Sequence, residues 1–226
     1  MTEFLIALCA FLVAHLIPAS PRLRTSLIRR LGRKVYLAAY SMLSLILLGW
    51  LIVAARDADP IPLWEPAPWQ WHLTLVAMPI ATFFLVAGLI APNPLSISLR
   101  HDSTPGAVTR VTRHPVLWAF LIWALAHIPP NGDLVTVILF GIMALFSLIG
   151  FILLDAKTKR RVGRVRWRAL SRETSVVPFA AILAGRASPV GLRSLALAGL
   201  IAVLLYGWFV LQGHALLIGA DPLAAL

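Results

Sequence analysis

The sequence is poor in charged residues, and acidic side chains are the scarcest of them. Charged residues make up 13% of the 226 residues, with 9 Asp and Glu against 20 Lys and Arg, whereas 60% of the chain is hydrophobic. Soluble globular proteins average about 25% charged and about 45–50% apolar residues. The mean hydropathy of +0.87 exceeds what one soluble core can bury, so we expect an integral membrane protein.

Cysteine is almost absent, since Cys9 is the only one. A single cysteine excludes an internal disulfide and a multi-cysteine metal site, and we interpret Cys9 as a small apolar side chain. Paired intramembrane carboxylates, a Gly-rich phosphate loop and a recognisable Ser-His-Asp order are also missing. These absences argue against a hydrolase and against a nucleotide-driven transporter.

Six apolar runs are candidates for membrane-spanning helices. About 20 helical residues are needed to cross a hydrocarbon core of about 30 Å. Four runs have that length, at 35–55, 71–91, 134–154 and 192–212, and two shorter ones lie at 4–18 and 115–129. We therefore predict one all-α domain over 1–226, a polytopic transmembrane helix bundle of about six spans with two short ones.

The basic residues set the orientation of these spans. Every Lys and Arg except Arg56 falls in 22–34, in 100–113, in 157–172 or at 186 and 193. Because cytoplasmic loops near span ends retain positive charge, both termini should lie on the outer side. The net charge of +11 alternates with apolar runs instead of forming one face, so we expect anionic lipid at the cytoplasmic face and no nucleic acid as partner.

One further segment is apolar but too short to span. Residues 175–186 read SVVPFAAILAGR and are interrupted by Pro178 and Gly185. We predict an interfacial or re-entrant helix on the inner side.

Histidine is the ionisable residue that the apolar runs do contain. His15 lies near the inner end of the first run, His114 at the inner mouth of the run 115–129, and His127 near the outer end of that run. His114 and His127 are about 20 Å apart along a helix, so they cannot share one metal. A bis-histidine site must pair His15 with one of them, and membrane depth favours His114.

The surroundings of His127 suit a large planar ligand. Phe120, Trp123 and Ala124 precede it by seven, four and three residues, which places an aromatic stripe with a small gap on its helix face. Haem with imidazole ligation needs such a slot. The alternative is a packed, hydrogen-bonded core histidine. His72, His214 and His101 lie at span ends or in a loop and are interpreted as solvated.

Four ordered segments resemble the NnrU family of bacterial membrane proteins over essentially the whole chain. They are AHLIPASPRLR, GRKVYLAAYSMLS, TRHPVLWAFLIWALAH and TSVVPFAAILAGR. The resemblance implies a location in the bacterial inner (plasma) membrane, which with the charge pattern makes both termini periplasmic. It also implies a link to denitrification, in the expression or maturation of nitrite and nitric oxide reductases, with those enzymes or their maturation factors as partners.

The family is also similar to the plant zeta-carotene isomerase, a haem b membrane enzyme. That similarity implies haem b as cofactor, with His15 and His127 as the metal ligands, and isomerase-like redox chemistry. The isomerase has a cysteine three residues before the second histidine, where this chain has Ala124. A thiolate ligand switch is therefore not expected.

The inner-side arginines suggest a polar cap. Arg113, Arg110, His114 and the segment 174–186 would hold an anionic group, such as haem propionates, lipid phosphate or a nucleotide-like cofactor, with lipid headgroups alone as the simpler alternative. Arg113, His114 and Pro115 also resemble the motif of isoprenylcysteine-type membrane methyltransferases, which implies S-adenosylmethionine. Their acidic pair is absent after the next span. A cofactor-free assembly factor is the third alternative.

Overall fold

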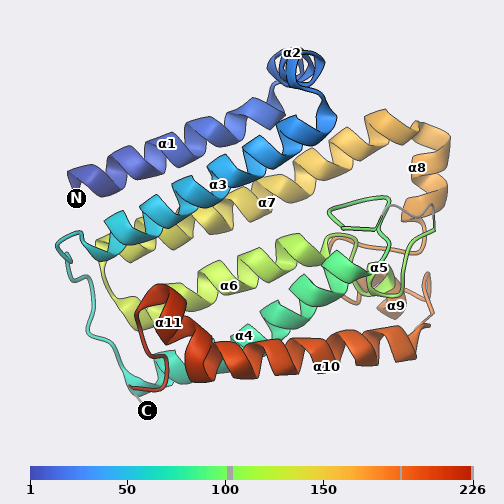
Figure 1. The fold of residues 1–226 in the computed structure, drawn as a ribbon. Helices are drawn as coiled ribbons and strands as arrows, with labels where there is room; N and C mark the ends of the chain where they lie inside the picture. The colour runs from blue at the N-terminus through green and yellow to red at the C-terminus, as the bar shows by residue number, and fades with distance from the viewer. Residues whose placement is uncertain (101–103, 189, 225–226) are drawn as a thin grey trace. The chain divides into compact units, whose positions relative to one another are not determined.

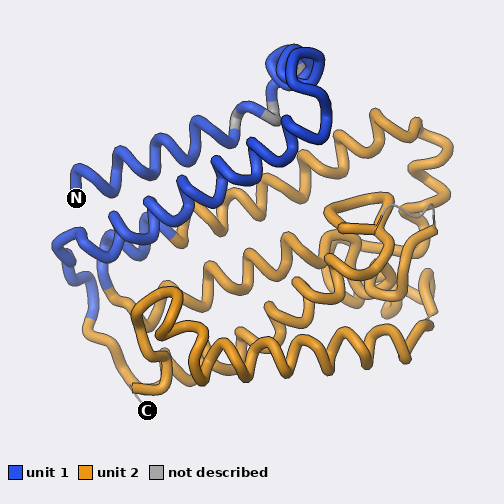
Figure 2. The backbone as a smooth tube through the Cα atoms, in the orientation of Figure 1, with its two compact units in different colours: residues 1–64, 133–139 blue, residues 65–132, 140–226 orange. Residues whose placement is uncertain are grey.

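The computed structural model describes residues 1–100, 104–188 and 190–224, and the regular secondary structure of that part of the chain is helical. Its helices form two compact units (Figure 2). Unit 1 comprises Met1–Trp64 and Asp133–Leu139, and unit 2 comprises Glu65–Gly132 and Phe140–Leu226. Each unit is described by itself. His101 lies outside the described residues.

Unit 1 is built on a pair of apolar helices. α1 (Thr2–Ala19) packs against α3 (Arg33–Arg56), and α2 (Pro21–Leu31) contacts both (Figure 1). The first turn of α2 accepts Pro21, which lacks an amide hydrogen that would otherwise stay unpaired there. Gly32 then adopts φ 78°, a conformation that favours glycine, and separates α2 from α3.

Unit 2 holds the longer helices. They are α4 (Pro68–Ile90), α6 (Pro115–Asn131), α7 (Leu134–Val162, of which the first six residues belong to unit 1) and α10 (Leu192–Trp208), which continues through a π-helical turn, η1 (Phe209–Gly213), into α11 (His214–Ile218). Three short helices connect them, α5 (Val108–Val111), α8 (Arg164–Ser171) and α9 (Ala180–Leu183). α4 packs against both α6 and α10, as Figure 1 shows.

The contact between α4 and α6 is close because a glycine lies in it. A Cβ atom at Gly88 would stand 2.8 Å from Cγ2 of Val116 and 2.9 Å from Cγ of Pro115. Both distances are shorter than carbon atoms tolerate, so a side chain here would push the helices apart. Gly88 thus sets how closely α4 approaches the start of α6.

Four helices of the described chain are long and apolar enough to cross a membrane. They are Arg33–Arg56, Pro68–Ile90, Leu134–Val162 and Leu192–Ile218. The predicted long runs coincide with them, and the predicted short runs coincide with α1 and α6. The all-helical, membrane-type fold is thereby confirmed, and the total of about six spans stays a prediction that depends on the two shorter helices.

Two segments that were predicted to lie on the inner side differ in conformation from the expectation. The helix predicted over 175–186 is a single turn, α9, preceded by irregular chain with bends and turns. Phe179 adopts φ 63°, outside the helical region, and Pro178 precedes it, so a longer helix does not form. Conversely, the basic segments 22–34 and 157–172 are largely helical, in α2, the end of α7 and α8, because Arg, Lys and Leu are strong helix formers.

Candidate functional site

A buried polar cluster in unit 2 joins the α4–α5 loop, the start of α6 and the last part of α7. His114 is completely buried, and each of its ring nitrogens contacts a side chain: Nδ1 lies 2.8 Å from Oγ of Ser96, and Nε2 lies 2.8 Å from Oδ1 of Asp155. The other carboxylate oxygen of Asp155 accepts a hydrogen bond from Arg113. Asp155 therefore joins two consecutive residues of the Arg-His-Pro motif.

The start of α6 places His114 in this cluster. Pro115 occupies the first helical position, so the helix cannot extend backwards and His114 stays in a non-helical conformation (φ −124°, ψ 62°). Asn93, which is buried, donates its side-chain amide to the carbonyl of Arg113 and accepts from the amide of Leu95. The loop that carries Ser96 is thereby attached to the backbone beside His114.

The end of α7 holds the same loop from the other side. Thr158 donates to the carbonyl of Leu95 at 3.2 Å, and Arg161 donates to the carbonyl of Pro94 at 2.6 Å. Residues 94–96 therefore run between the end of α7 and the start of α6. Ser96 and Asp155 reach His114 because both of their segments are fixed by separate hydrogen bonds.

The segment 174–179 covers the start of α6. The amide of Arg113 donates to the carbonyl of Ser175 at 2.7 Å, and the indole of Trp118 donates to the carbonyl of Val176 at 2.8 Å. The amide of Phe179 donates to the carbonyl of Val111 at 2.7 Å. These bonds use the backbone groups that an interfacial helix would have paired internally, which explains why only α9 is helical here.

The arginines predicted to form an anion-binding cap already have partners in the protein. The guanidinium of Arg113 is paired with Asp155 and lies 5.0 Å from the ring of Trp167. Arg110 pairs with Glu173 at 3.0 Å, and Arg186 donates to backbone carbonyls. Arg113 retains one buried donor, Nε, without a partner among the described residues. Anion binding by this cap stays a prediction.

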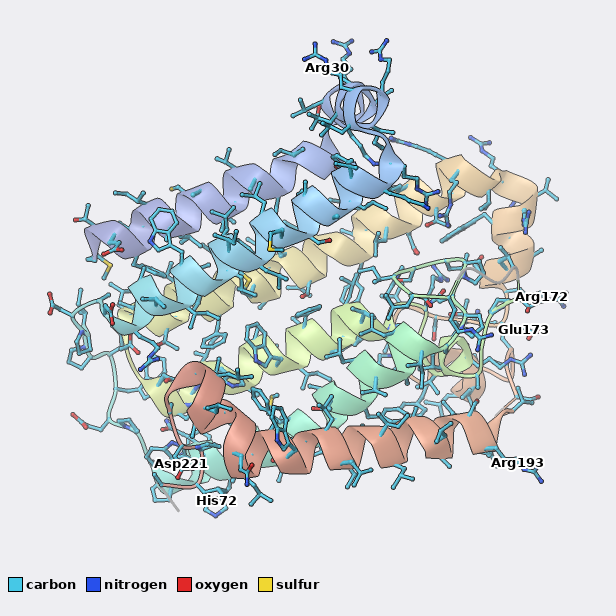
Figure 3. All side chains as sticks on the ribbon, in the orientation of Figure 1. Arg30, His72, Arg172, Glu173, Arg193 and Asp221 are labelled. Carbon is cyan, nitrogen blue, oxygen red and sulfur yellow. The ribbon has the colours of Figure 1, made fainter. Side chains whose placement is uncertain are left out.

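The two ends of unit 2 carry different ionisable side chains. Figure 3 shows Arg172, Glu173 and Arg193 at the end that holds α8 and α9, and His72 and Asp221 at the opposite end. Ser96, His114 and Asp155 belong to the first of these ends, since they occupy the α4–α5 loop, the start of α6 and the last part of α7. The polar cluster is thus on the basic side.

His127 lies on α6 in an aromatic setting. Its Nδ1 is 2.7 Å from the carbonyl oxygen of Trp123. Its ring stacks on Phe140 of α7 with centroids 5.0 Å apart, and the ring of Trp123 is 5.5 Å away. Phe120 is 47% exposed and touches Trp123 instead of the histidine. Trp123 is therefore placed as the sequence suggested, and Phe140 supplies the second aromatic wall.

His15 lies in a comparable setting in unit 1. Its Nδ1 is 2.7 Å from the carbonyl oxygen of Phe11, whose ring is 4.1 Å away. Tyr40 of α3 meets its ring edge-on at 6.1 Å, and Tyr36 stacks on Tyr40. The hydroxyl of Tyr36 is buried and has no hydrogen-bond partner among the described residues. A buried polar atom without a protein partner is a place where a ligand can add a contact.

The three candidate histidines differ in what their nitrogens contact. His114 engages side chains through both ring nitrogens, whereas Nδ1 of His15 and Nδ1 of His127 each contact a carbonyl four residues earlier in the same helix. His72, which is exposed, makes the same type of bond to Pro68. No group of three or more His, Cys, Asp or Glu side chains that could hold a metal ion occurs among the described residues.

Four residues that contact the three candidate histidines were not identified from the sequence. Ser96 and Asp155 contact His114, Phe140 contacts His127, and Tyr40 contacts His15. Asp155 carried a usable signal, since it directly follows the apolar run 134–154, and a carboxylate that close to an apolar span is costly and marks a candidate site. The absence of a recognisable Ser-His-Asp order in the sequence did not exclude such an arrangement, because Ser96, His114 and Asp155 meet in the structure from three distant segments.

Comparison with known proteins identifies the family and no more specific relative. No curated protein and no solved structure matches the chain. The family described as NnrU protein matches over residues 3–222, which is nearly the full length and includes the Arg-His-Pro segment, α1 and α10. The chain therefore belongs to the NnrU family.

Proposed function

We propose that this NnrU family member is a bacterial inner-membrane protein that binds haem b through His15 and His127. The observation that carries the proposal is the shared setting of these two imidazoles. In each, Nδ1 contacts a carbonyl of its own helix at 2.7 Å, which selects the tautomer with the lone pair on Nε2. Metal-ligating histidines have their second nitrogen held in this way.

The side chains around both histidines suit a porphyrin. Trp123 and Phe140 flank His127, and Phe11 and Tyr40 flank His15. The orphaned hydroxyl of Tyr36 is available to a polar edge of the group. A haem with two imidazole ligands supplies one-electron chemistry at its iron. The protein's own contribution is to fix the tautomer and to keep water away from both rings.

His114 is the less suitable partner for His15. A haem ligand must offer a lone pair to iron, and both ring nitrogens of His114 are within 2.8 Å of protein oxygens. Using one of them would break a hydrogen bond to Ser96 or Asp155 inside a fully buried site, at a cost of about 1–3 kcal/mol. This supports His127 over the depth argument, which favoured His114.

An absorption spectrum of the purified full-length protein tests the proposal. A Soret band that shifts on dithionite reduction is expected, and His15→Ala or His127→Ala should abolish it. His72→Ala is the matched control, because His72 makes the same Nδ1 bond but is exposed, and should leave the band unchanged. A colourless protein, or a band that survives both substitutions, contradicts the proposal.

The biological role that we propose rests on family membership. Haem binding in the inner membrane would support the maturation of nitrite and nitric oxide reductases, or an isomerase-like redox reaction. Complementation of a deletion strain tests the first role. Wild-type protein should restore nitrite reductase activity, and His127→Ala should not, while His72→Ala should. Full restoration by His127→Ala would separate the role from haem and favour a cofactor-free assembly factor.

One set of contacts supports the methyltransferase alternative. Asp155 brings a carboxylate to Arg113 and His114, whereas the sequence showed no acidic pair after the span. Arg113 and His114 each already contact one oxygen of that carboxylate, so Asp155 has little hydrogen-bonding capacity left to bind a cofactor. Binding of S-adenosylmethionine to the colourless protein, lost in Arg113→Ala, would favour this alternative.

We further propose that α2 lies at the cytoplasmic membrane surface against anionic lipid. Leu23 and Leu31 are 45% and 47% exposed on this short helix, which also carries Arg22, Arg24, Arg29 and Arg30. Exposed leucines beside several arginines are typical of helices that lie in the headgroup layer. A fluorophore at Leu23 should be quenched by brominated lipid. Quenching only by water-soluble agents would contradict this placement.

A further inference from the structure

The Ser96–His114–Asp155 cluster is independent of the proposed haem ligands and has the arrangement of an activated nucleophile. A serine hydroxyl lies within hydrogen-bond distance of an imidazole, at 2.8 Å, and a carboxylate holds the other ring nitrogen, also at 2.8 Å. A nucleophile, a base and a group that orients the base, each within about 2.6–3.2 Å of the next, are the signature of covalent catalysis by serine.

The hydrogen-bond partners of Asp155 assign the roles of the two ring nitrogens. Arg113 donates to one carboxylate oxygen, and the other carboxylate oxygen lies 2.8 Å from Nε2 of His114. As an acceptor toward His114, Asp155 receives the hydrogen of Nε2, which leaves the lone pair of Nδ1 for the hydroxyl proton of Ser96. The two nitrogens are exchanged relative to chymotrypsin-type triads, but either ring nitrogen can act as the base.

Ser96 and His114 differ in solvent exposure in the way that a nucleophilic site requires. His114 is fully buried, whereas Ser96 is partly exposed on the loop that follows α4. The next backbone amide, at Ile97, donates to no acceptor in the described part of the chain. The amide that follows a nucleophilic serine is a common donor to the oxyanion.

The position of the cluster indicates the substrate class. Ser96 follows the end of α4 by six residues, and Asp155 precedes the basic residues at the end of α7. This is the level at which apolar spans meet headgroups, where the ester bonds of membrane lipids lie. Ile97 and Leu99 follow Ser96 in the same loop and are 40% and 72% exposed, so they offer apolar surface to an acyl chain.

We infer that Ser96, His114 and Asp155 form a nucleophilic site for carboxylic esters of membrane lipids. Oγ of Ser96 forms a bond to the ester carbonyl carbon while its proton moves to Nδ1 of His114. The bond to the leaving alcohol breaks, and the proton passes from His114 to the alcohol oxygen. Water, deprotonated by His114, then attacks the acyl group, releases the carboxylic acid and returns the proton to Ser96. The sequence needs no oxidant or reductant.

A long-chain alkyl fluorophosphonate tests the nucleophile in the full-length protein. Oγ of Ser96 should form a bond to phosphorus with loss of fluoride, and peptide mass spectrometry should place the adduct on Ser96. Ser96→Ala should lose the adduct. Ser98→Ala is the matched control, because Ser98 lies in the same loop and donates to the carbonyl of Ala91 at 2.6 Å. Asp155→Asn should slow labelling by at least about 100-fold, since a triad Asp→Asn change lowers kcat by about 10⁴.

A thiol variant keeps the test independent of folding defects. In a Cys9→Ala background, Ser96→Cys should react with iodoacetamide at least about tenfold faster than Ser98→Cys, because a neighbouring imidazole promotes the thiolate. Equal rates, or a wild-type protein that stays unlabelled by the fluorophosphonate, would overturn the nucleophilic role.

Phospholipid vesicles that contain the protein then test the substrate class. Wild-type protein should release free fatty acid, and Ser96→Ala should release none above the empty vesicles. Labelling at Ser96 without fatty acid release would overturn the assignment to lipid esters. These outcomes do not affect the haem proposal, because Ser96→Ala leaves both proposed iron ligands in place.

Discussion

Nε2 of His114 lies 2.8 Å from Oδ1 of Asp155, although the two residues are separated by 41 positions in the chain. The contact joins the residue before α6 to the last third of α7. It also explains how a carboxylate persists in an apolar helix, since Arg113 balances its charge. A buried acid that is paired and hydrogen-bonded is tolerated where an isolated one is not.

The first prediction compares two ion pairs of unit 2. Asp155→Ala leaves Arg113 and His114 without their acceptor, and Asp155 is only 24% exposed, so the free energy of unfolding should fall by about 2–4 kcal/mol. Glu173→Ala removes a more exposed partner, 57% accessible, and should cost less than about 1 kcal/mol. Thermal melting in detergent measures both. Equal losses would show that the Asp155 pair contributes no more than a surface contact.

The second prediction separates the histidine of the polar cluster, His114, from the proposed ligand histidine, His127. His114→Ala deletes two buried hydrogen bonds, so the melting temperature should drop, corresponding to about 2–4 kcal/mol, while the haem spectrum of the folded fraction is retained. His127→Ala should do the reverse, with loss of the Soret band and a smaller change in melting temperature. A Soret band lost only in His114→Ala would reverse the assignment of the two residues.

The third prediction concerns the approach of α4 to α6. Gly88→Ala places a methyl group 2.8 Å from Cγ2 of Val116, and the repacking should cost about 1–3 kcal/mol. At Gly199 in α10 an added Cβ meets no atom within 4 Å, so Gly199→Ala should be neutral or stabilise the helix by up to about 1 kcal/mol. A Gly88→Ala variant as stable as wild type would mean that the two helices can separate without cost.

The fourth prediction is the topology. A reporter that is active in the cytoplasm should function when it is fused after Gly163, which lies between the basic ends of α7 and α8. The same reporter fused after Leu226 should be inactive, and a periplasmic reporter there should be active. Cytoplasmic activity at Leu226 would mean that α1, α6 or another of the predicted spans does not cross the bilayer.

The sequence by itself determined where the helices lie. A long apolar run can satisfy its backbone hydrogen bonds in a bilayer only as a helix, so the runs 35–55 and 71–91 predicted α3 and α4 to within a few residues. The run 115–129 likewise predicted α6, because Pro115 marks its start. The family could also be recognised from the sequence, because each of the four segments that carry the resemblance is a contiguous run of residues.

Only the tertiary structure decided which side chains meet. The contacts of His114 with Ser96 and Asp155, and of His127 with Phe140, depend on the rotation and axial offset of neighbouring helices. Neither quantity is encoded by local periodicity, because α6 and α7 are apolar on all sides. The segment 174–179 illustrates the same limit. Its composition suggested a helix, and hydrogen bonds from Arg113 and Trp118 to its carbonyls hold it in a non-helical conformation instead.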